Sequence, residues 1–89
     1  MSPVWNDPVK LRELSGDMRK AAKKFHEEID QLRNAHKRLT LSCRDEKIDE
    51  FGLDFNKTCK SIEELEDVLK STAKHLDGKA EEFEKVQQI

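Results

Sequence analysis

Apolar side chains recur along the first half of the chain at alternating steps of three and four residues, interrupted only at Glu28. This spacing is typical of one face of an α-helix. Asp7 can cap the first backbone amides, and Pro8 suits the first helical position. The pattern predicts a helix over residues 8–39 after a cap segment over residues 1–7. Its stripe consists of Leu11, Leu14, Met18, Ala21, Phe25, Leu32, Ala35 and Leu39, widened by Ala22 and Ile29.

The same rhythm returns after an interruption at residues 40–45, which we interpret as a turn. Ser42 or Asp45 can cap a second helix, and acidic residues suit its first turn. Gly78 predicts the end of that helix, because glycine is the usual residue just past a helix end. We therefore expect a helix over 46–77 and a loosely attached tail over 78–89. The second stripe consists of Ile48, Phe51, Phe55, Thr58, Ile62, Leu65, Leu69, Thr72 and Leu76, continuing weakly through Phe83 and Val86.

A turn of about five residues between two long helices makes them antiparallel neighbours. The predicted fold class is all-α, an antiparallel helical hairpin. Residues 1–42 carry a net charge of +3 and residues 43–89 a net charge of −5. Antiparallel packing therefore places a basic helix beside an acidic one, which favours this pairing over the stacking of like halves.

One hairpin buries only the surface that its two helices share, and the stripes hold more large side chains than that surface can cover. A second hairpin making a four-helix bundle with coiled-coil packing is the simplest partner, as a homodimer or as a heterodimer with a similar hairpin. Trp5 can serve either as an anchor in the partner or as a staple against Leu11. The predicted partner-interface residues are Trp5, Phe25, Leu32, Phe55, Leu65, Leu69 and Phe83.

Small and reactive residues give three further expectations. Gly16 and Gly52 lie inside predicted helices, where a glycine is either tolerated or marks a close approach of helices; for Gly16 we favour tolerance. Cys43 and Cys59 are sixteen residues apart, which on a helix is more than ~20 Å and excludes a disulfide within the chain. We expect free thiols, with Cys59 near the core and Cys43 able to bridge two chains.

Motifs for catalysis or cofactor binding are absent from the sequence. None of His26, His36 or His75 has a Glu three residues earlier, as di-iron bundles require, and the helical zinc motif His-Glu-x-x-His is missing. His26 and Asp30 could hold a metal weakly, but we interpret them as a surface pair. We therefore predict a protein that is not an enzyme and has no cofactor and no small-molecule substrate; a metal or redox bundle using the cysteines or histidines ranks third among our hypotheses.

Charge and hydropathy exclude two more partner classes. The basic cluster Arg19, Lys20, Lys23 and Lys24 lies in a chain of net charge −2 without interleaved aromatic residues, so we interpret it as a solvated helix face and expect no nucleic-acid partner. No run approaches the ~20 apolar residues of a membrane span, and the first residues lack a signal-peptide pattern. We expect a soluble protein made in the cytoplasm, which could be secreted only by a route that needs no signal peptide.

The length, the two long helices and the segment from Leu39 to Asp45 before Phe51 and Phe55 resemble the WXG family. These are small helical hairpins associated with type VII secretion. Cys43 and Asp45 stand where that family has Trp and Gly, and Phe83 with Gln87 is the nearest analogue of its Tyr-containing export tail. The resemblance implies an interaction module that dimerises and binds partners in secretion or escort. The alternative is a cytoplasmic adaptor or chaperone-like helical protein that is not exported.

Overall fold

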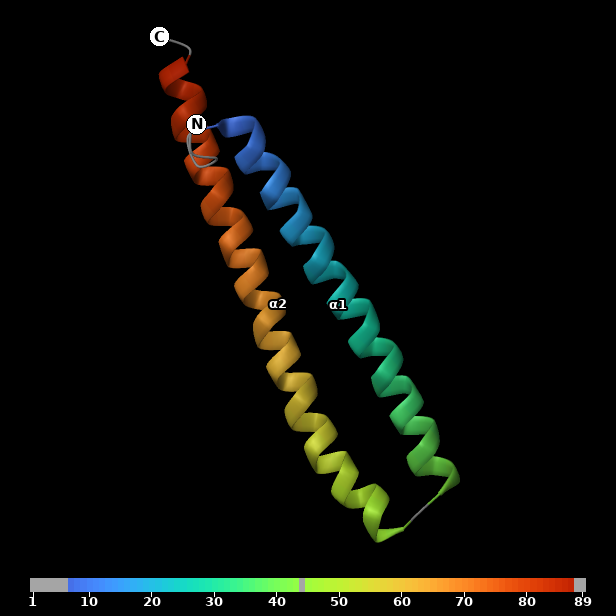
Figure 1. Cartoon of the computed structure of the whole chain (residues 1–89). Helices are drawn as coiled ribbons and strands as arrows, with labels where there is room; N and C mark the ends of the chain where they lie inside the picture. The colour runs from blue at the N-terminus through green and yellow to red at the C-terminus, as the bar shows by residue number, and fades with distance from the viewer. Residues whose placement is uncertain (1–6, 44, 88–89) are drawn as a thin grey trace.

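Two long antiparallel helices make up the computed structural model, which describes residues 7–43 and 45–87. Helix α1 spans Pro8–Ser42 and helix α2 spans Glu46–Gln87. They lie side by side in opposite directions and form a rod of 67 × 21 × 16 Å (Figure 1). The predicted all-α hairpin is confirmed. In the part of the chain that the structure describes, no helix is both long and apolar enough to cross a membrane.

Both helices begin at an aspartate that caps the first backbone amides. The Asp7 carboxylate accepts a hydrogen bond from the backbone N–H of Val9 at 3.0 Å, with Pro8 in the first turn as predicted. At α2 the cap is Asp45, whose carboxylate accepts from the N–H of Ile48 at 2.9 Å. Of the two caps that the sequence allowed, Asp45 is therefore the one used, and Ser42 is the last residue of α1.

The helices run further than predicted. Helix α1 continues three residues past 39, and α2 passes through Gly78 and ends at Gln87. The predicted helix end at residue 77 is wrong because a glycine inside a helix costs only about 1 kcal/mol. Packing beyond it outweighs that cost: Ala80 is 0% exposed, and Glu84 forms an ion pair with Arg12 of α1 at 2.6 Å.

The helices meet along two columns of mostly small residues, each repeating every seventh position, which we call the seam. A seven-residue repeat keeps one line of each helix facing its neighbour. Ser15, Ala22, Ala73 and Ala80 are all at most 1% exposed, so the two backbones approach closely along the rod. The seam consists of Ser15, Ala22, Ile29 and His36 in α1 and of Gly52, Cys59, Glu66, Ala73 and Ala80 in α2.

Gly52 marks the closest approach among the glycines. A Cβ atom added there would lie 3.3 Å from Nε2 of His36, whose ring stacks on Phe55 at a centroid distance of 4.7 Å. A Cβ atom added at Gly16 would meet nothing within 4 Å. Gly52 is therefore a close-contact glycine, whereas Gly16 is a tolerated one, as favoured from the sequence.

Both cysteines are free thiols. Cys59 is 1% exposed in the seam, and Cys43 is exposed where α1 meets the turn. The prediction that no bridge links them within one chain is confirmed. Cys43 remains the accessible thiol for a contact between chains.

Candidate interaction surface

Large apolar side chains gather on one flank of the seam, most of them three positions after a seam residue or one position before one. We call this surface the apolar face. None of its side chains is fully buried, and Leu32, Phe51 and Leu65 are 48%, 50% and 46% exposed. It consists of Leu14, Met18, Phe25, Leu32 and Leu39 from α1 and of Ile48, Phe51, Phe55, Ile62, Leu65, Leu69 and Leu76 from α2.

Five of the residues predicted for a partner interface lie in this face. Phe25 is 37% exposed, Leu32 and Leu65 are nearly half exposed, and Phe55 and Leu69 are half-buried. The expectation that one hairpin cannot bury all five is confirmed. Their contact with a partner stays a prediction.

Of the two remaining predicted residues, the structure describes only Phe83. Phe83 is half-buried near the end of α2, so it belongs to a segment held against α1 and not to a loose tail. Trp5 lies outside the described residues. The apolar face is therefore the candidate site, and Phe83, seven positions after Leu76, continues its row on α2.

A hollow of about 370 Å³ opens in the apolar face where Glu28 interrupts the stripe of α1. Phe25, Leu32 and Ile62 line it, together with Lys24. A hole bordered by large apolar side chains of neighbouring turns is the shape that receives a side chain from another helix. The hollow is thus a candidate socket within the apolar face.

The opposite flank of the seam is an ordered row of ion pairs, which we call the charged flank. Arg12 pairs with Glu84 at 2.6 Å, Arg19 pairs with Asp77 at 2.6 Å, and Arg33 pairs with Glu63. The arginines are spaced by multiples of seven, and the two residue numbers in each pair total 96. The basic-against-acidic pairing expected from the net charges is therefore made on this flank.

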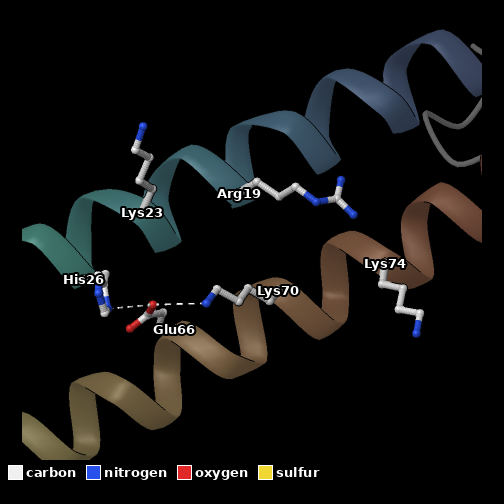
Figure 2. Close-up of a pocket in the computed structure, with 6 residues that line it drawn as sticks. All are labelled: Arg19, Lys23, His26, Glu66, Lys70 and Lys74. Atoms are coloured by element: carbon white, nitrogen blue, oxygen red, sulfur yellow. Dashed lines mark ion pairs between the residues drawn. The ribbon is translucent and has the colours of Figure 1, made fainter.

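One pair of positions in the charged flank departs from the pattern, and we call it the irregular rung. His26 occupies the position where the other pairs have an arginine, and Lys70 occupies the position where they have an acidic residue. The carboxylate of Glu66, a seam residue with 7% side-chain exposure, lies between them. It is 3.3 Å from Nδ1 of His26 and 3.2 Å from Nζ of Lys70 (Figure 2). Buried carboxylates need such partners. Glu66 was missed from the sequence, although its seven-residue spacing from Cys59 and Ala73 marks it as a seam position.

A hollow of about 540 Å³ surrounds this rung and is lined almost entirely by charged side chains. Figure 2 shows Lys23 pointing away from α2 and Lys74 pointing away from α1. Arg19 is tied to Asp77, and Nε2 of His26 lies 3.5 Å from the Asp30 carboxylate. Among the described residues, no group of three or more His, Cys, Asp or Glu side chains could hold a metal ion. We assign this hollow a structural role in pairing Glu66.

The charged flank makes folding stability depend on pH. The hydrogen bond from Arg12 lowers the pKa of Glu84 below its ordinary 4.5. Hydrogen bonds from Arg19 and then from Ser15 lower the pKa of Asp77 below 3.8. A carboxylate whose pKa is depressed in the folded state contributes stability above its unfolded pKa and loses it as the pH falls through the folded value.

Acidification should therefore lower the melting temperature from about pH 4 downward, where ordinary carboxylates begin to protonate. Asp77→Asn and Glu84→Gln should each make this loss shallower, because one of the contributing carboxylates is gone. Circular dichroism melts between neutral and acidic pH measure it. The control is Asp67→Asn, which removes an exposed carboxylate with no ion pair in the structure. An equal acid response in all four proteins would contradict the prediction.

No protein-family model, curated protein or solved structure matches this chain. Function must therefore be argued from the surface itself.

Proposed function

We propose that the protein is a helical interaction module, without catalytic activity, whose apolar face packs against a second helical hairpin to complete a four-helix bundle. The observation that carries the proposal is the continuous row of large apolar side chains along both helices, none of them fully buried. Two packed helices leave one such row each, and a second pair of helices is the arrangement that covers both rows at once.

The exposed area of the chain supports a large partner surface. The accessible surface is 7221 Å², whereas a compact monomer of this mass exposes roughly 5,400 Å². The excess of roughly 1,800 Å² for one chain is in the range that obligate dimers bury in each subunit. The radius of gyration of 19.5 Å also exceeds the roughly 12 Å expected of a compact domain of this length.

A second, more specific proposal concerns the biological process in which the paired hairpins act. The hairpin architecture supports a WXG-like role in delivery or escort through type VII-type secretion, as the resemblance of the sequence implies. In that role the bundle would be the unit that a secretion partner recognises. Co-expression with a candidate secretion partner, followed by assay of export, tests this finer step separately from the pairing.

The pairing is tested by placing a charge in the apolar face. Leu65→Glu puts a carboxylate at a side chain that is 46% exposed in the hairpin but covered in the bundle. We expect the dissociation constant for assembly to rise at least about tenfold, because burying an unpaired charge is costly, while helicity stays unchanged at concentrations where the variant still assembles. Sedimentation equilibrium over a range of concentrations measures this.

The matched control is Ser71→Glu, which adds the same charge at an exposed position of α2 outside the apolar face. It should assemble like the parent. If the parent were monomeric at every concentration and yet fully helical with a high melting temperature, the hairpin would need no partner and the proposal would fail.

A further inference from the structure

We infer that the apolar face is covered by a second copy of this chain, with the two-fold axis running along the rod so that the two turns lie at the same end. The inference rests on the proposed function and adds the identity and the orientation of the partner. It follows from charge, register and shape, taken in turn.

Two symmetric arrangements can bring the apolar faces of two copies together. With the two-fold axis along the rod, α1 lies beside α2 of the partner subunit, and both turns are at one end. With the axis across the rod, α1 lies beside α1 of the partner subunit, and the turns are at opposite ends. Neighbouring helices are antiparallel in both cases, so helix direction alone does not choose between them.

The net charges of the helices choose the first arrangement. Helix α1 carries nine Lys/Arg and five Asp/Glu, a net of +4, while α2 carries seven and twelve, a net of −5. With the axis along the rod, every contact between neighbouring helices joins a basic helix to an acidic one. The crosswise axis would place basic beside basic and acidic beside acidic. Charge complementarity of this kind sets orientation more than affinity.

The register of the hairpin can be carried over to the contact between copies. In an antiparallel pair of helices, residues at the same height have numbers with a nearly constant sum. For the ion pairs between α1 and α2 this sum lies between 89, for Arg12–Asp77, and 96, for Arg12–Glu84. A two-fold axis along the rod leaves α2 of the partner subunit at the same height as α2 of the first. Residues whose numbers total within this range are therefore neighbours across the new contact as well.

Three of the four charged residues at the outer edge of the apolar face on α1 then come opposite a charge of the other sign, whereas Lys24 comes opposite Val68 of the partner subunit, since their numbers total 92. On α1 this edge carries Lys10, Asp17, Lys24 and Arg38, spaced by multiples of seven. Asp17 comes opposite Lys79 of the partner subunit, Arg38 opposite Asp54 of the partner subunit, and Lys10 opposite Glu82 of the partner subunit. Each of these pairs totals 92 or 96.

The apolar face is also complementary to itself in shape. Leu65, 46% exposed on α2, comes opposite the hollow between Phe25 and Leu32, since its number and that of Glu28 total 93. The same contact occurs twice by symmetry. One chain thus supplies the projection, the socket and both signs of edge charge, so a second copy suffices as the partner.

Cys43 reports the orientation directly, because it is exposed at the turn. In the inferred dimer the two Cys43 residues are on diagonal helices of one bundle end, with backbones roughly 15 Å apart. In the crosswise dimer they are separated by nearly the rod length of 67 Å. Spin labels on Cys43 in a Cys59→Ala background, read by pulsed electron resonance at a concentration where the dimer forms, separate the two.

A mixed dimer provides the reciprocal measurement. One copy is labelled at Cys43, and the other carries Cys43→Ser with Val9→Cys, a position that is 64% exposed at the opposite end of α1. We expect a short distance for Cys43 with Cys43 and a long one for the mixed pair. The reverse result would contradict the inferred orientation but not the proposed function. If the protein stayed monomeric and melted at low temperature, a second copy would not be the partner. The apolar face would then need a different hairpin to cover it.

Discussion

Ala73→Leu should lower the free energy of unfolding by about 3 kcal/mol, the upper end of the usual cost of overpacking a core. Ala73 is 0% exposed in the seam between α1 and α2. The three added carbon atoms have no space there unless the helices move apart. Moving them apart would also loosen the neighbouring seam contacts. Urea denaturation at one fixed protein concentration measures the loss, because assembly would otherwise change the apparent stability.

The control for this prediction is Ser71→Leu, which adds a leucine two residues away at an exposed position on the same helix. Its effect should stay within about 0.5 kcal/mol, as for most surface substitutions. If Ala73→Leu denatured at the same urea concentration as Ser71→Leu, the helices would not be closely packed at the seam.

Truncation after Gly78 should lower the free energy of unfolding by at least about 2 kcal/mol, the scale of exposing one large apolar side chain. The removed segment holds Ala80, which is 0% exposed, and Glu84, the partner of Arg12. The Arg12–Glu84 pair shows that this segment lies against the start of α1, where Leu11 is only 2% exposed. Figure 1 shows the same neighbourhood, with the orange-red part of α2 alongside the first turns of α1 and the last turns of α2 continuing past them. Thermal and urea denaturation measure the loss.

Val86→Ala is the matched control for the truncation, because Val86 belongs to the same segment but is 68% exposed. It should leave the stability nearly unchanged. If the truncated protein denatured like the parent, residues 79–89 would be a loose extension, as the sequence alone had indicated.

The sequence predicted the helices well because their signals are local. Asp7 with Pro8 and the three-and-four spacing of apolar residues act within one or two turns. Gly78 misled for the same reason. Its cost is local, whereas the burial of Ala80 and the Arg12–Glu84 pair depend on a helix about seventy residues away in sequence.

The line along which the helices meet could not be read from the size of the side chains. The apolar stripes are centred on large residues such as Phe25 and Leu65. The buried contact between the helices nevertheless passes through Ala22 and Ala73. Small residues allow the shortest distance between backbones, and the large ones are displaced to one flank. Their displacement leaves the apolar face exposed, which is why residues predicted for a partner interface lie beside the seam and not in it.

A seam that repeats every seven residues could in principle slip by one repeat and still set small residues against small residues. The rung of His26 and Lys70 removes that freedom. A slip in one direction would bring Lys70 opposite Arg19, and a slip in the other would bring it opposite Arg33. Only the native frame sets Lys70 against the one member of that row that is not an arginine, with Glu66 between them. The irregular rung thus favours the native alignment of the two helices over alignments shifted by seven residues during folding.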